Sequence, residues 1–114
     1  MAGSNTREFT DANFQADVLQ SDLPVVVDLW ADWCAPCRAL APTIDALADE
    51  LSGTVTIGKM DITANPQTPS SMGVTAIPTI LLFQGGKEVG RIVGSGKTPD
   101  DFKKEFAKAF GVQV

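Results

Sequence analysis

Residues 27–38 read Val27-Asp28-Leu29-Trp30-Ala31-Asp32-Trp33-Cys34-Ala35-Pro36-Cys37-Arg38, and this stretch decides the fold. It contains both cysteines and both tryptophans of the chain. The apolar run Val25-Val26-Val27 leads into it, and a helical pattern follows it. A Cys-x-x-Cys pair at the junction between a buried strand and a helix indicates a dithiol/disulfide redox site. The remaining chain is then a scaffold that presents this pair.

Length and composition are those of an ordinary globular protein. The chain has 114 residues, 44% of them hydrophobic and 20% charged, which is enough to bury a core as one domain over residues 1–114. We expect residues 1–6 to be a flexible N-terminal segment. The formal net charge of -5 disfavours binding to nucleic acid, because phosphate contacts need a basic face. The chain has no histidine, which excludes a zinc site of Cys and His within one chain.

The cysteine count and the apolar runs predict where the protein works. Two cysteines are too few for the disulfide framework of a small secreted protein. The polar N-terminus lacks the apolar core of a signal peptide, and no run approaches the ~20 apolar residues that span a bilayer. We therefore expect a soluble, monomeric, cytoplasmic protein that binds no membrane, metal or cofactor.

Apolar patterning predicts alternating strands and helices that end in a hairpin. Strands are expected at 7–9, 25–30, 55–60, 80–83 and 88–93, with Gly85-Gly86 as the hairpin turn and 25–30 as a central strand covered on both faces. Helices are expected from Thr10 or Asp11 to about Gln20, over 34–51 with a kink at Pro42, and from Thr98 to Gly111, with 65–73 a loop or a short, weak helix. This order predicts an α/β fold, a mixed sheet with helices on both faces.

The position of the cysteines at a helix start determines their chemistry. A thiolate attacks a disulfide, and a free cysteine with a pKa of about 8.5 is mostly protonated at neutral pH. Unpaired N–H groups and a partial positive charge at the helix N-terminus would stabilise a thiolate at Cys34. Cys37 is one turn further along and faces inward, close enough to form a disulfide with Cys34. Cys34 is therefore the expected attacking thiol and Cys37 the resolving one, with Pro36 limiting the flexibility between them.

Several motifs, in the correct order along nearly the whole chain, resemble the thioredoxin family. They are Trp33-Cys34-Ala35-Pro36-Cys37 with its lead-in Val27 to Ala31, Asp61 to Pro66, Ile77-Pro78-Thr79, Phe83 to Lys87, and Val93-Gly94. The resemblance implies the thioredoxin fold, a central mixed five-stranded β-sheet flanked by four helices. Three residues depart from the usual pattern: Ala35 replaces glycine, Leu29 phenylalanine and Met72 tyrosine. Only Ala35 touches the active site, and its methyl group leaves the reaction type unchanged.

The resemblance implies a general protein-disulfide reductase that acts on disulfide-containing proteins and is recycled by a thioredoxin reductase. Cys34 and Cys37 would carry the exchange. Asp28 would act as general base for Cys37, and burial in the central strand would raise its pKa toward neutrality. Lys59 would lie near Asp28 and tune it, although an ammonium that reaches solvent explains the same pattern.

The resemblance also implies how substrate is held. The Ile77–Pro78 bond would be cis and would pack against the dithiol. The expected substrate-binding residues are Trp33, Ala35, Pro36, Ala76, Ile77, Pro78 and Gly94. Two alternatives stay open: a binding or chaperone module without essential redox turnover, and a zinc ion or cluster shared across a dimer through Cys34 and Cys37.

Overall fold

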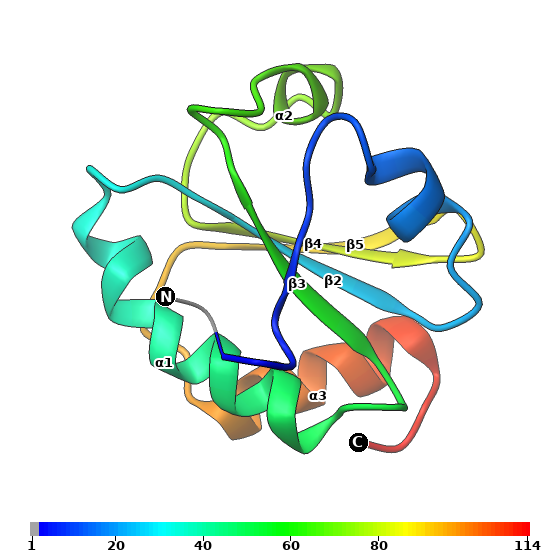
Figure 1. Cartoon of the computed structure of the whole chain (residues 1–114). Helices are drawn as coiled ribbons and strands as arrows, with labels where there is room; N and C mark the ends of the chain where they lie inside the picture. The colour runs from blue at the N-terminus through cyan, green and yellow to red at the C-terminus, as the bar shows by residue number, and fades with distance from the viewer. Residues whose placement is uncertain (1–2) are drawn as a thin grey trace.

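The computed structural model describes residues 3–114 and contains one five-stranded mixed sheet (Figure 1). Its strands are β1 (Arg7–Glu8), β2 (Val25–Trp30), β3 (Thr56–Asp61), β4 (Thr79–Gln84) and β5 (Lys87–Val93), in the spatial order β1-β3-β2-β4-β5. The central strand β2 runs parallel to β3 and antiparallel to β4. β1 extends the parallel side, and β5 forms the hairpin with β4. The predicted mixed sheet is confirmed.

Helices cover both faces of the sheet. The helices α1 (Ala35–Glu50) and α3 (Pro99–Phe110) lie together on one face, and η1 (Gln15–Leu19) and α2 (Gln67–Ser71) lie on the other (Figure 1). Each face has its own apolar core. The first core includes Val26, Ile44, Leu47, Ile80, Leu82, Phe102 and Phe106, and the second includes Phe9, Phe14, Val18, Val27, Leu29, Leu81 and Phe83. The central strand is therefore covered on both sides, as its apolar sequence predicted.

Side chains along β2 point alternately to the two faces of the sheet, which determines the face on which Asp28 lies. Val25, Val27 and Leu29 belong to the core under η1 and α2. Val26 belongs to the core under α1 and α3. Because side chains alternate along a strand, Asp28 shares the face of Val26 and points toward the α1 layer. Asp28 is fully buried there, with 0% exposure.

Both long helices begin with side-chain caps close to the predicted starts. Cys34 is the N-cap of α1, so that helix begins one residue later than predicted, and Pro42 lies in its interior. Thr98 caps α3 in a reciprocal capping box with Asp101. Gly111 ends α3 at a φ of 67°, the left-handed conformation that glycine adopts without strain.

The N-terminal helix is shorter than predicted. We expected it to begin at Thr10 or Asp11 and reach about Gln20, whereas the structure has turns over residues 11–13 and a π-helix at Gln15–Leu19. The side chain of Asn13 accepts the N–H of Thr10 at 2.7 Å, and the Thr10 hydroxyl accepts the N–H of Asn13 at 3.0 Å. This reciprocal pair of bonds is arranged like a capping box, but turns follow it over residues 11–13 before the π-helix begins.

The carboxylate of Asp11, expected as a possible cap of its own helix, serves another element. Its oxygens accept the N–H groups of Gln67 at 3.1 Å and Thr68 at 2.8 Å. N–H groups at the start of a helix have no partner within the helix, and α2 is only five residues long. The segment over 65–73, expected as a loop or a short, weak helix, therefore contains a short helix, and Asp11 holds its N-terminal end.

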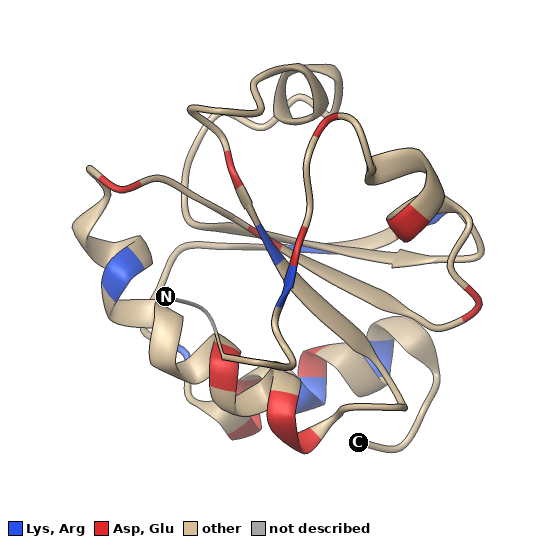
Figure 2. Cartoon of the chain, viewed as in Figure 1, with Lys and Arg blue, Asp and Glu red and all other residues tan. Residues whose placement is uncertain are grey.

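The N-terminal segment that precedes β1 lies against α1. The amide of Asn5 donates to Asp49 at 3.0 Å, and the Thr6 hydroxyl donates to Asp45 at 2.6 Å. The flexible segment expected over residues 1–6 therefore has two of its members bonded to a helix, and residues 1–2 lie outside the described part. Figure 2 shows that acidic positions cluster on α1, whereas lysine and arginine are dispersed over several elements.

Candidate active site

Cys34 and Cys37 form a disulfide at the start of α1, with their Cα atoms 5.2 Å apart. Cys34 has extended backbone angles, and its Sγ accepts the N–H of Cys37 at 3.3 Å. The exposed fractions are 6% for Cys34 and 2% for Cys37. An N–H group aimed at the Cys34 sulfur favours a negative charge there once the disulfide is opened. Ala35 and Pro36 are exposed in the intervening turn.

The cysteines pack against apolar side chains from separate parts of the chain. Ala31 is buried with them, and Trp30, Ile62 and Ile77 cover the cluster. Because β2 and β3 are parallel, their carboxyl ends meet at one edge of the sheet. The N–H of Ile62 donates to the Trp30 carbonyl at 3.0 Å and continues this pairing beyond β3.

Trp33 forms one wall of a groove beside the dithiol. Its ring is 68% exposed, and its indole Nε1 donates to the Thr63 hydroxyl at 3.3 Å. The groove has a volume of about 160 Å³ and is lined by Trp33, Ile62, Pro69, Val74, Thr75, Ala76 and Ile77. Sequence reasoning missed Ile62, Thr63, Pro69, Val74 and Thr75. The parallel pairing of β2 and β3 could have indicated the first two, because residues after β3 lie beside residues after β2.

The loop that leads into β4 brings the predicted residues Ala76 and Ile77 to this groove, whereas the predicted residues Ala35, Pro36, Pro78 and Gly94 do not line it. The Ile77–Pro78 bond is cis, as expected. The Thr79 hydroxyl donates to the Ala76 carbonyl at 2.5 Å, and the Gly94 N–H donates to the Pro78 carbonyl at 2.9 Å. Gly94 has a φ of 94°, a conformation in which other residues are strained. Gly94, directly after β5, therefore lies next to Pro78.

Asp28 and Lys59 are direct neighbours across β2 and β3. Burial raises the pKa of Asp28 from 3.8 to about 7, while the charge of Lys59 lowers it and that of Asp45 raises it. Neither carboxyl oxygen of Asp28 has a hydrogen-bond partner among residues 3–114. The Lys59 ammonium instead lies 4.4 Å from the centre of the Trp30 ring, a cation–π contact. Lys59 therefore acts on Asp28 through its charge and not through a hydrogen bond.

Residues 3–114 contain no group of three or more His, Cys, Asp or Glu side chains arranged to hold a metal ion. Within the same residues, no helix combines the length and the apolar character needed to cross a membrane.

Comparison with known proteins agrees with this geometry. The family model for thioredoxin matches residues 5–108. A thioredoxin from Synechocystis is 45% identical over 92 residues, which are 81% of this chain and 86% of that protein. A thioredoxin from Rickettsia typhi is 51% identical over 85 residues, 75% of this chain and 81% of that protein. The bifunctional thioredoxin reductase/thioredoxin of Mycobacterium leprae is 49% identical over 90 residues, 79% of this chain but 20% of that longer protein.

The Cys34–Cys37 disulfide at a helix N-terminus and these matches together define a thiol–disulfide oxidoreductase. The chain belongs to the thioredoxin family.

Proposed function

We propose that this protein is a general protein-disulfide reductase, built as a single domain in which Cys34 is the attacking thiol. The observation that carries the proposal is the Cys34–Cys37 disulfide, whose outer sulfur accepts an N–H bond at the start of α1. The reduced form begins the reaction. The Cys34 thiolate attacks one sulfur of a substrate disulfide, a mixed disulfide forms, and the other substrate sulfur leaves as a thiolate that takes up a proton.

Cys37 completes the cycle with Asp28 as its base. The Cys37 thiol loses its proton and its sulfur attacks Sγ of Cys34, which releases the second substrate thiol. Two electrons have then passed to the substrate, and Cys34–Cys37 is a disulfide. A buried carboxyl with a pKa of about 7 can accept and release a proton near neutral pH. The charge of Lys59 keeps that pKa from rising further.

Residues of the groove and of its surroundings hold the substrate near Cys34. We assign this role to Trp33, Ala35 and Pro36 from the dithiol side, to Ala76, Ile77 and Pro78 from the loop, and to Gly94 from the end of β5. An exposed aromatic ring beside a groove with apolar walls suits an extended segment of another protein, because such a segment offers apolar side chains.

A thioredoxin reductase is the proposed electron donor. In the Mycobacterium leprae relative, a thioredoxin reductase and a thioredoxin are parts of one protein. A disulfide reductase also needs surroundings that keep it reduced, so we propose the cytoplasm as its compartment. We propose that the protein works there as a monomer in electron transport to protein disulfides and in redox homeostasis, without nucleic acid, membrane or bound cofactor.

Insulin reduction tests the function directly. The protein with a dithiol donor should precipitate the insulin B chain far faster than the donor alone. Replacement of both cysteines by serine should abolish the acceleration, whereas a binding or chaperone module would keep its partner binding in that variant. An undiminished insulin rate in the double variant would contradict the reductase function.

Single substitutions test the order of attack. Cys37→Ser should accumulate mixed disulfides on Cys34 that are visible on non-reducing gels, because the resolving step is lost. Cys34→Ser is the matched control and should accumulate none. Trapping on Cys37 in place of Cys34 would overturn the assignment.

A further inference from the structure

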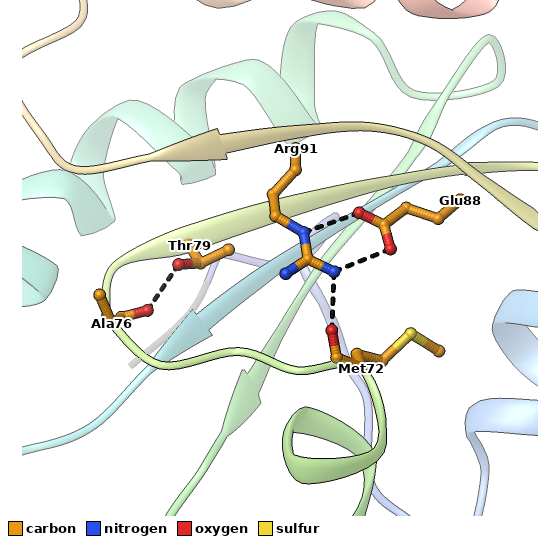
Figure 3. A network of polar contacts seen from close by, with 5 residues as sticks. All are labelled: Met72, Ala76, Thr79, Glu88 and Arg91. Carbon is orange, nitrogen blue, oxygen red and sulfur yellow. Dashed lines mark hydrogen bonds and ion pairs between the residues drawn. The ribbon is translucent and has the colours of Figure 1, made fainter.

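An arginine on β5 is bonded to the start of the loop that borders the dithiol (Figure 3). Nη2 of Arg91 donates to the Met72 carbonyl at 2.8 Å. The same guanidinium is held by Glu88, with Nε to Oε2 at 2.8 Å and Nη2 to Oε1 at 2.9 Å. Figure 3 shows the guanidinium between the Glu88 carboxylate and the Met72 carbonyl. A fixed ion pair thus presents a charged donor to one backbone oxygen.

A β-bulge makes this ion pair possible. Residues three apart on a regular strand point to opposite faces of the sheet. Arg91 pairs with Leu81 and Glu88 with Phe83, and the register shifts between Leu82 and Phe83. The strand β5 therefore has one more residue than β4 in this interval, and Arg91 and Glu88 face the same side. Bulges commonly redirect a side chain beside a functional site.

The anchored carbonyl lies where the chain leaves α2 for the active site. Met72 is the C-cap of this short helix, and Gly73 follows with a φ of 68°. A helix of this length has little stability of its own. Its start is held by Asp11, and its end by Arg91. Both ends of the segment thus depend on charged side chains from other elements.

The segment between Met72 and Pro78 forms a wall of the groove. Val74, Thr75, Ala76 and Ile77 all line it, together with Trp33. The far end of the segment is fixed by the bonds Thr79 to Ala76 and Gly94 to Pro78. The near end is fixed by the Val74 N–H, which donates to the Pro69 carbonyl at 3.0 Å, and by Arg91. Loss of the Arg91 bond therefore loosens the near end and leaves the contacts of the far end in place.

We propose that Arg91, oriented by Glu88, is a positioning residue that holds the 73–77 wall of the groove in the conformation that binds protein substrates. Arg91 touches neither cysteine, so it acts on substrate binding and not on the exchange itself. The proposal rests on the proposed reductase function for its kinetic consequence. Its structural part, the ordering of residues 73–77, does not depend on that function.

The guanidinium shape is essential to this role. Nη2 donates to the carboxylate and to the Met72 carbonyl, while Nε fixes the plane of the group. A lysine ammonium retains the charge but lacks the planar fork, so it cannot keep the same donor directed at both partners. Arg91→Lys should therefore give an effect between wild type and Arg91→Met, which removes all donors at similar side-chain length.

The kinetic test compares a protein disulfide with a small aromatic disulfide. Arg91→Met should raise KM for insulin about three- to tenfold, the effect expected for loss of one charge-assisted hydrogen bond. The value of kcat and the rate with the small disulfide should stay within about twofold of wild type, because the dithiol is untouched. Lys103→Met is the matched control, since it removes an ion pair of Lys103 with Glu50 that lies between α3 and α1. Its KM should equal that of wild type.

Amide hydrogen exchange supplies the structural test. Exchange at residues 73–77 should be faster in Arg91→Met and unchanged in Lys103→Met. An unchanged KM for insulin, an equal loss with the small disulfide, or unchanged exchange at 73–77 would each overturn the proposal. If wild type itself fails to reduce insulin, the reductase function fails, while the exchange measurement still decides the role of Arg91. If Arg91→Met does not fold, Arg91→Lys carries the same measurements, with a KM and exchange rate above wild type as the expected result.

Discussion

Asp28 is the residue whose chemistry is changed most by its surroundings. It lies on the central strand with 0% exposure, and burial raises its pKa to about 7. Lys59 opposes this shift through its charge, since its ammonium lies over Trp30 and makes no hydrogen bond to the carboxylate. Proximity to a lysine therefore does not keep Asp28 ionised in the acid range, and the carboxyl titrates where a base for Cys37 is needed.

Replacement of Asp28 by asparagine should stabilise the protein at neutral and alkaline pH. Between pH 3.8 and about 7 the folded carboxyl keeps its proton while the unfolded one has lost it. The folded state then binds more protons, so the free energy of unfolding of wild type falls as pH rises through this window and levels off above it. Asp28→Asn has no carboxyl at this position, so its free energy of unfolding does not fall in this window. In urea unfolding, the difference in free energy between Asp28→Asn and wild type should grow from near zero at pH 4 to about 4 kcal/mol at pH 8.

Lys59→Gln provides the control for this assignment. Removal of a positive charge that lowers the Asp28 pKa should move the midpoint of the wild-type pH dependence upward. The chain has no histidine, the side chain that would otherwise titrate in this range. A stability difference between Asp28→Asn and wild type that is the same at pH 4 and pH 8 would contradict the raised pKa.

Local sequence predicted some residues of the site and missed others, for a physical reason. Cys34, Cys37 and Asp28 could be found because their signals lie within one strand–helix junction. The bond from Trp33 to Thr63 and the bond from Arg91 to Met72 join distant segments. The second also depends on a bulge in β5, a feature of strand register that single-residue preferences do not encode.

Among the elements, α3 is the one whose start is determined most locally. The Thr98 hydroxyl accepts the N–H of Asp101 at 3.1 Å, and the Asp101 carboxylate accepts the N–H of Thr98 at 3.0 Å. Thr98→Ala removes the first bond and should lower the free energy of unfolding by about 1 kcal/mol in urea denaturation. Thr98→Ser keeps an acceptor at the same place and should lie close to wild type. Equal losses in both variants would show that the hydroxyl does not cap the helix.

The accuracy of the predicted elements follows the range of the interactions that define them. The starts of α1 and α3 and the central strand β2 have strong local signals, and their predicted bounds are within about two residues of the structure. The helix predicted from Thr10 or Asp11 was wrong at its start. Asp11 looks like a helix cap in the sequence, but it bonds to Thr68 on α2, far along the chain. The sequence around Asp11 indicates only a cap for the helix that follows it. It does not indicate that the same carboxylate caps α2.

For the molecule as a whole, the site depends on segments that only the complete sheet brings together. The cysteines cluster with Ile62 from the region after β3 and Ile77 from the loop before β4. Ile62 follows β3 and Ile77 precedes β4. Both strands contribute residues to the core under α1 and α3 and to the core on the opposite face. The geometry of the groove should therefore persist until the sheet unfolds, as in a two-state protein of this size.

Phe106→Leu tests this dependence, because Phe106 is fully buried in the α1–α3 core and lies outside the cysteine cluster. Its ring packs against those of Phe102 and Phe110, with centroids 6.0 and 6.2 Å away and the ring planes tilted by 36° and 35°. Loss of these aromatic contacts should lower the free energy of unfolding by about 1–2 kcal/mol.

Trp30 and Trp33 both lie at the dithiol and the chain has no tyrosine, so fluorescence reports the site while far-ultraviolet circular dichroism reports the helices. In urea, both transitions should move together to lower concentration with unchanged slope. A fluorescence transition that stays at the wild-type midpoint while the dichroism transition moves would mean that the site is stable independently of the core.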